Sequence, residues 1–253
     1  MSADHPIPVL EVNGLGKRYK GARSHAVNNL SFTVGKGEIF GFLGPNGAGK
    51  TTTISIMSTL MKPSRGQVKI CGIDIQKTPA EARKHISLVP QEIALYHELT
   101  GKENLKYFGA MYGLDKKTLA QKISMALETF DIKAYENQRI SRCSGGIKRR
   151  FNLACGILHD PALIFLDEPT VGMDVHSRNT LLEQIRSLSD RGSTIVYTTH
   201  YMEEAQNICS RVLIMNKGIS LAEGDPADLV QREPSCRNLG DLFLSITGKR
   251  LGD

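Results

Sequence analysis

The sequence predicts an α/β fold with a mainly parallel central sheet, an N-terminal antiparallel β-subdomain and an α-helical subdomain. Two observations indicate the parallel sheet. A glycine-rich loop stands between a short apolar strand and a helix at residues 38–61, and a continuous apolar run ends in two acids at 162–168. A third observation, the helical spacing of apolar residues at 92–142, indicates a helical insertion between these two segments.

Composition sets limits on the class of protein. The 253 residues, 40% apolar and 23% charged, suit one globular domain over residues 1–253. The net charge of +6 favours solubility, an anionic membrane surface or nucleic acid, and does not choose among them. No run of about eighteen apolar residues predicts a membrane span, and residues 1–6 lack the features of a signal segment. Five cysteines without metal-ligand spacing indicate a reducing, cytosolic setting with mostly buried thiols.

The first third of the chain reads as strands followed by the glycine loop and a helix. Strands are predicted at 9–15, 30–34, 38–43, 67–70 and 86–89, and a helix at 51–61 that Pro63 ends. A capping box at Thr78 predicts a second, short helix. Tyr19 lies between the first two strands, and its spacing fits a core residue and an aromatic platform for adenine equally well.

The helical insertion and the second half of the sheet follow. A capping box at Thr100 begins a helix that Gly113 ends, and a second helix carries an apolar face up to Phe130. With the helix after Ser144, the helical subdomain covers about residues 92–160. Later strands are predicted at 162–166, 193–198, 212–215 and 219–222. A helix with Leu181, Ile185 and Leu188 on one side is predicted to end at Gly192, and another is predicted near 202–209. Small helices at 226–231 and 239–246 form a C-terminal tail at 225–253.

The glycine-rich loop matches the phosphate-binding pattern G-x-x-x-x-G-K-[ST] at residues 44–51. Its glycines let the backbone approach a ligand closely, and the N–H groups of the loop and the helix start point at one anion. We expect Lys50 to reach the β- and γ-phosphates and Thr51 to bind Mg²⁺. An ordinary glycine turn is disfavoured because Lys-Thr follows the last glycine. The expected nucleotide contacts here are Gly44, Pro45, Asn46, Gly47, Ala48, Gly49, Lys50, Thr51 and Thr52.

Polar residues at three strand ends complete the predicted site, because ligands of α/β sheets bind at the carboxyl edge. Asp167 is expected to hold Mg²⁺, and Glu168, pointing the other way on an extended chain, to deprotonate the attacking water. Two solvated carboxylates are the alternative. His200 is expected to contact the γ-phosphate, although a lone histidine is more often structural. Gln91 is expected to reach Mg²⁺ or the attacking water.

Ser144, Gly145 and Gly146 begin a helix and form a second candidate anion site. A simple N-cap explains this pattern equally well by itself. One nucleotide does not need two such sites in one fold. The economical interpretation is that the second site serves a nucleotide held by another copy of the chain.

Together these motifs resemble the nucleotide-binding subunit of an ABC transporter over nearly the full length. Residues 44–51 match its Walker A loop, 163–168 its Walker B strand and 171–174 its D-loop, with Asp174 as the acidic residue. Tyr19 matches the adenine-stacking tyrosine, Gln91 the Q-loop glutamine and His200 the switch histidine. Residues 143–147 match the Leu-Ser-Gly-Gly-Gln signature, with Cys143 replacing leucine and Ile147 replacing glutamine. Residues 148–150, 199–204 and 239–250 resemble the branch of drug-resistance and lipid exporters.

The resemblance implies a P-loop NTPase (RecA-like) core and an ATPase that uses ATP and Mg²⁺. It implies a homodimer, or a heterodimer with a second ATPase subunit, in which Ser144, Gly145, Gly146 and Asp174 serve the partner's ATP. It also implies a separate transmembrane permease subunit, a peripheral location on the cytoplasmic face of the inner or plasma membrane, export of an unknown substrate, and no nucleic acid. Loss of the signature glutamine is expected to remove one polar contact between the two copies.

The sequence disfavours two alternatives to a transport ATPase. An ATPase of the same superfamily that acts on DNA or the ribosome is disfavoured, because residues 51–144 hold no long coiled coil and the chain carries a single set of motifs. A non-hydrolysing regulatory subunit is disfavoured because Glu168 and His200 are both present.

Overall fold

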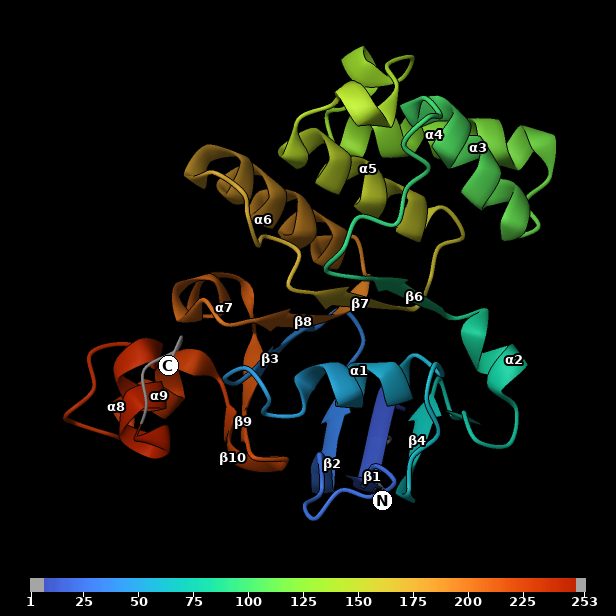
Figure 1. Ribbon diagram of the computed structural model, residues 1–253. Helices are drawn as coiled ribbons and strands as arrows, with labels where there is room; N and C mark the ends of the chain where they lie inside the picture. Colours follow the sequence, from blue (N-terminus) through green and yellow to red (C-terminus); the bar gives the residue numbers. More distant parts are fainter. Residues whose placement is uncertain (1–6, 249–253) are drawn as a thin grey trace, which may run out of the picture.

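The computed structural model describes residues 7–248 and contains two sheets (Figure 1). The larger has the strand order β10-β9-β3-β8-β7-β6. Its strands are parallel except that β10 runs antiparallel to β9. They are β3 (Ile39–Leu43), β6 (Ile86–Val89), β7 (Leu163–Asp167), β8 (Thr194–Thr199), β9 (Arg211–Asn216) and β10 (Ile219–Gly224). The predicted parallel core is therefore confirmed.

The smaller sheet is antiparallel, with the order β2-β1-β4-β5, which confirms the predicted N-terminal β-subdomain. Its strands are β1 (Leu10–Lys17), β2 (Val27–Val34), β4 (Arg65–Ile70) and β5 (Ile73–Asp74). Helix α1 (Lys50–Met57) lies against it in Figure 1. Ile54 and Met57 of this helix share one buried cluster with residues of both sheets, so the helix that starts at the glycine loop is packed between them.

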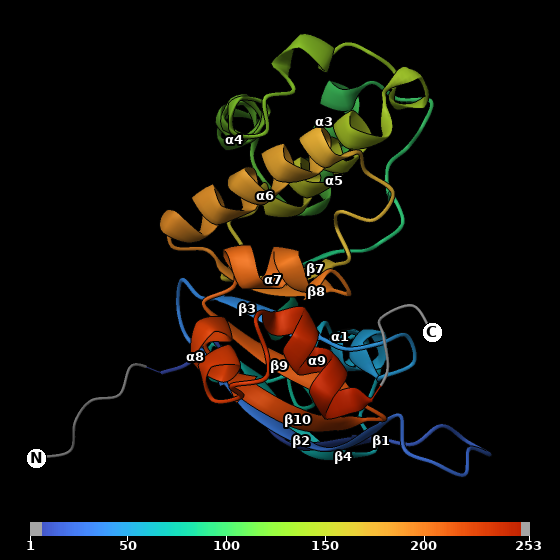
Figure 2. The same cartoon turned by 90° about the vertical axis from the view of Figure 1, so that its left-hand side faces the viewer.

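The remaining helices include a layer over the other face of the larger sheet and a group at the C-terminal end (Figures 1 and 2), whereas Ala82 of the short helix at 79–83 belongs to the buried cluster of α1. They are α2 (Pro79–Arg83), α3 (Gly101–Met111), α4 (Lys116–Thr129), α5 (Gly145–Ile157), α6 (Val175–Asp190), α7 (Met202–Ile208), α8 (Pro226–Gln231) and α9 (Leu239–Thr247), with 3₁₀ turns at Lys133–Tyr135 and Ile140–Arg142. In both views α5 lies beside α6, and α3 and α4 lie farther from the antiparallel sheet than α6 does.

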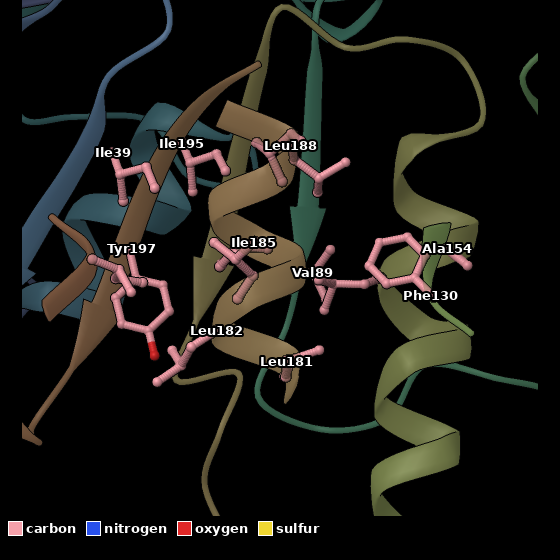
Figure 3. Packing of buried hydrophobic residues seen from close by; sticks show 14 of the residues in the cluster. Ile39, Val89, Phe130, Ala154, Leu181, Leu182, Ile185, Leu188, Ile195 and Tyr197 are labelled. Atoms are coloured by element: carbon pink, nitrogen blue, oxygen red, sulfur yellow. The ribbon is translucent and has the colours of Figure 1, made fainter. Parts of the chain in front are cut away.

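The apolar stripe predicted for α6 is core (Figure 3). Leu181, Leu182, Ile185 and Leu188 of α6 belong to one buried cluster with Ile195 and Tyr197 of β8 and with residues of α4 and α5. Burial of a leucine or isoleucine side chain is worth about 1.5–3 kcal/mol. This cluster joins the helical layer to the strands whose ends carry the predicted site.

Two local predictions are wrong. The helix predicted at 51–61 ends at Met57, because Thr59 adopts a left-handed conformation (φ 66°) before Pro63 is reached. The capping box at Thr78 does not form, since the Glu81 carboxylate pairs with Lys84 at 2.7 Å instead. The capping box at Thr100 does form: its hydroxyl accepts from the Glu103 N–H, and the Glu103 carboxylate accepts from the Thr100 N–H.

Glycine ends two helices as predicted, with left-handed Gly113 and Gly192 directly after the last residues of α3 and α6 and their C-caps. None of the helices within residues 7–248 combines the length and apolarity that crossing a membrane requires. Cys143, Cys155 and Cys209 are buried, whereas Cys71 is exposed and Cys236 half-buried. The prediction about a signal segment concerns residues 1–6, and part of the predicted tail is residues 249–253; both lie outside the described range.

Gly101 offers a test of the packing between α3 and α5. A Cβ at this position would lie 2.2 Å from Cζ of Phe151, which is fully buried. We expect Gly101→Ala to lower the free energy of unfolding by about 1–3 kcal/mol, because the ring has no room to move away. Denaturant unfolding without nucleotide measures the change.

Gly145→Ala is the matched control, since Gly145 is also the first residue of a helix and nothing lies within 4 Å of its added Cβ. Its stability should match or slightly exceed that of the wild type. An equal loss in both variants would show that crowding against Phe151 is not the cause.

Candidate nucleotide-binding site

The glycine-rich loop connects β3 to α1, and neighbouring backbone fixes its shape. Gly49 has φ 107°, and a Cβ there would lie 2.3 Å from the Ala26 carbonyl oxygen. Gly44 has φ 157°, and a Cβ there would lie 2.3 Å from the Met215 carbonyl oxygen. A side chain is therefore excluded at both positions. Gly49 is the N-cap of α1, so the loop leads directly into the start of that helix.

Lys50 is the first residue of α1, and only 5% of it is exposed. Its Nζ donates to the Gly44 carbonyl at 2.7 Å and to the Pro45 carbonyl at 3.3 Å. Its Nζ also lies 3.8 Å from Oε1 of Glu168. Burial lowers the pKa of Lys50, while the charges of Glu168 and Asp167 oppose that shift. The Lys50 amine therefore lies between two loop carbonyls and the acidic residues at the end of β7.

Asp167 is the last residue of β7 and bonds to the neighbouring strand. The Thr198 hydroxyl donates to Oδ1 of Asp167 at 2.7 Å and accepts from the Glu168 N–H at 2.9 Å. Burial raises the pKa of Asp167, and the hydrogen bond from Thr198 opposes that effect. One hydroxyl therefore holds both acidic residues in place.

The prediction that Glu168 lies on an extended chain is wrong. Glu168 adopts a left-handed conformation (φ 47°), so the chain is not extended there and the alternation of side chains ends at Asp167. Both carboxylates instead lie near Lys50. Oε2 of Glu168 lies 3.1 Å from Nδ1 of His200, and Glu168 is 9% exposed. The parallel pairing of Asp167 with Thr198 places these strand ends side by side, as predicted for His200.

These residues surround a cleft of about 480 Å³. The predicted residues that line it are Pro45, Asn46, Gly47, Gly49, Lys50, Thr51, Thr52, Gln91, Glu168 and His200. Gly44, Ala48 and Asp167 support the cleft without lining it. Tyr19 follows β1, is 43% exposed, and its hydroxyl lies 3.1 Å from Oγ1 of Thr52. The interpretation of Tyr19 as a core residue is therefore wrong.

The second candidate anion site does not lie at this cleft. Ser144 caps α5 by accepting from the Ile147 N–H at 3.4 Å, and Ser144 and Gly145 are exposed. Asp174 caps α6 by accepting from the Ser177 N–H at 2.9 Å. Neither group, nor Gly146, lines the cleft of its own chain. Ile147 is 5% exposed and faces the core.

Sequence reasoning missed the residue that links the two candidate sites. Arg149, on α5, is 5% exposed and donates to the Pro90 carbonyl at 3.1 Å and the Gln91 carbonyl at 2.6 Å. Nothing in the sequence indicated which of the three consecutive bases at 148–150 turns inward. Thr198 was missed as well, because a strand threonine carries no sign of its partners.

Comparison with known proteins gave consistent results. A family described as "ABC transporter" matches residues 27–171. The linearmycin resistance ATP-binding protein LnrL of Bacillus subtilis is 42% identical over 240 residues, which are 94% of this chain and 75% of that protein. The Nod factor export ATP-binding protein I of a Rhizobium species is 41% identical, over 83% of this chain and 69% of that protein. A solved structure titled as the ATP-binding subunit of an ABC transporter has a TM-score of 0.84 and 29% identity, over 94% of this chain and 99% of that one.

Thr198 allows the support of the two acids to be tested. Thr198→Val keeps the shape but removes the hydrogen bond to the Glu168 N–H and the hydrogen bond to the Asp167 carboxylate. We expect the free energy of unfolding to fall by about 1–3 kcal/mol in urea titrations without nucleotide. Thr180→Val is the control, because that hydroxyl donates only to the His176 carbonyl of its own helix, and its change should stay within about 0.5 kcal/mol. Equal losses would contradict the assigned role.

Proposed function

The chain belongs to the ABC transporter family, and from that premise we propose that its cleft binds ATP with Mg²⁺ and that hydrolysis drives transport through a separate membrane subunit. The chain is an ATPase of this family. The convergence of Lys50, Glu168 and His200 at the glycine loop is the observation that supports these site assignments most strongly.

In the proposed mechanism the loop N–H groups and Lys50 bind the phosphates, and Tyr19 stacks on the adenine. The oxygen donors of Thr51, Asp167 and Gln91 fit Mg²⁺, which prefers hard oxygen ligands. The ion would neutralise charge on the phosphate oxygens. Here Lys50 contacts Oε1 of Glu168 and two loop carbonyls. A bound triphosphate would draw Lys50 toward itself and leave that carboxylate oxygen to accept a proton.

Glu168 is the proposed general base for the attacking water. Its Oε2 contacts His200, so the imidazole orients the carboxylate from one side while Oε1 faces the loop. General-base catalysis of this kind contributes about 10²–10⁴-fold to a rate. His200 lines the cleft, and in the proposed mechanism it would also contact the γ-phosphate.

A second copy of the chain, or a related ATPase subunit, is proposed to complete the site. Ser144, Gly145 and Gly146 present an exposed helix start with no phosphate loop of their own chain beside it. Asp174 lies at a similar exposed helix start on α6. In a head-to-tail pair these groups would face the partner's ATP. A shift of α5 in such a pair would then move the segment of Gln91, because Arg149 on α5 donates a hydrogen bond to the Gln91 carbonyl.

The membrane partner and location follow from the family. We propose that residues 92–160 act as the helical subdomain that receives a helix of a permease on the cytoplasmic face of the membrane. The names of relatives, which concern drug resistance and Nod factor export, favour export. An action on DNA or the ribosome is not favoured. The residues at 225–253 are proposed to form a small accessory tail.

Glu168→Gln tests the general base. We expect ATP binding to remain, ATPase turnover to fall by about 100-fold or more, and an ATP-bound dimer to accumulate. Steady-state phosphate release and size-exclusion chromatography with ATP and Mg²⁺ measure these effects. Glu183→Gln on the exposed face of α6 should behave as the wild type. Undiminished turnover in Glu168→Gln would remove this residue from the mechanism.

Ser144→Arg tests the shared site. We expect ATPase activity to be lost while the monomer binds ATP with unchanged affinity, because the added side chain blocks only the approach of a second copy. Ser141→Arg is the control, since Ser141 is exposed and lies three residues earlier. Wild-type rates for Ser144→Arg at every protein concentration would refute the shared site.

A further inference from the structure

A carboxylate that the proposed mechanism does not use is buried beside the catalytic pair. Glu204 lies on α7, four residues after His200, and is 4% exposed. Its Oε2 accepts hydrogen bonds from three hydroxyls: Tyr197 at 2.6 Å, Thr170 at 2.9 Å and Thr199 at 3.1 Å. The carboxylate of Glu204 therefore joins α7 to β8, which carries Tyr197 and Thr199, and to the segment after β7, which carries Thr170.

Two of these segments carry the reacting side chains. Thr170 follows Glu168 by two residues, and Thr199 directly precedes His200. The left-handed backbone at Glu168 persists only where its surroundings hold it. The 3.1 Å contact between Glu168 and His200 spans the same two segments that Glu204 joins.

The other oxygen of Glu204 faces α6. Within the described part of the chain Oε1 has no hydrogen-bond partner, and it lies 3.9 Å from Nε of Arg178. The Arg178 guanidinium lies over the ring of Tyr201, 5.6 Å from its centre, and that ring contacts His200. The carboxylate thus also interacts with α6, the helix that Asp174 caps.

We propose that Glu204 is a positioning residue that sets the separation between the Glu168 carboxylate and the His200 imidazole by holding Thr170 and Thr199. This inference rests on the roles proposed above for Glu168 and His200. A carboxylate that served only the stability of the core would depend on its three hydroxyl donors alike. A positioning carboxylate depends for turnover mainly on the two donors nearest in the chain to the reacting residues, Thr170 and Thr199, whereas Tyr197 lies three residues before His200 in β8.

Three single-hydroxyl variants separate these roles: Thr170→Val, Thr199→Val and Tyr197→Phe. Each removes one donor to the same oxygen with little change of shape. Thr199→Val also removes the acceptor of the Tyr201 N–H, so Thr170→Val is the cleaner of the two threonine variants. We expect the two threonine variants to lower kcat by about tenfold, because small displacements of reacting groups slow the chemical step. ATP affinity, measured by equilibrium titration with a fluorescent ATP analogue, should change by less than about twofold. Tyr197→Phe should lower kcat several times less than either threonine variant, although its bond is the shortest.

Variants of Glu204 itself give a second readout. Glu204→Gln keeps an acceptor oxygen, so its kcat should exceed that of Glu204→Ala while both bind ATP normally. Glu203→Gln, on the exposed side of the same helix, should match the wild type. If the Glu204 variants do not fold, the hydroxyl variants still decide the matter.

Three results would overturn the inference: equal losses of kcat in all three hydroxyl variants, losses matched by weaker ATP binding, and wild-type turnover in both threonine variants. The proposed function fails separately. Retained turnover in Glu168→Gln would refute the general base, whereas loss there with wild-type threonine variants would refute only the role of Glu204.

Discussion

The parallel pairing of β7 with β8 is the constraint on which the candidate site depends. Because Asp167 lies opposite Thr198, the acids at one strand end and the histidine at the next occupy one edge of the sheet. The Thr198 hydroxyl then serves both acids. The glycine loop reaches the same edge because β3 pairs with the other side of β8. A shift of one residue in this register would separate the cation of Lys50 from its carboxylates.

Local patterns made much of the fold predictable. The loop at 44–51, the apolar strand before Asp167 and the capping box at Thr100 each carry their own physical signal, and each formed as expected. The sequence could not reveal choices that tertiary contacts make. The early end of α1 at Met57 and the left-handed backbone of Glu168 depend on neighbouring segments. The inward turn of Arg149 depends on carbonyls about 58 residues away in the chain.

The groups assigned to catalysis lie in mutual contact. Lys50 is engaged by Glu168 and the loop carbonyls, and Glu168 is engaged by His200. The buried ammonium and carboxylates are thereby paired, which limits the desolvation penalty of charges inside the protein. The same groups are the ones a triphosphate would need. The exposed helix starts at Ser144 and Asp174 do not line this cleft, so a second copy would have to bring its own helix starts to it.

The link made by Arg149 ends on main-chain oxygens of Pro90 and Gln91, and no side chain at position 91 takes part in it. These two hydrogen bonds therefore do not require a glutamine side chain at position 91. In the proposed function, the Gln91 side chain would bind the metal, whereas the contact with α5 uses the backbone carbonyl of the same residue. A substitution at position 91 would thus alter the proposed hydrolysis and still keep the hydrogen bond from Arg149 of α5 to the backbone beside the cleft.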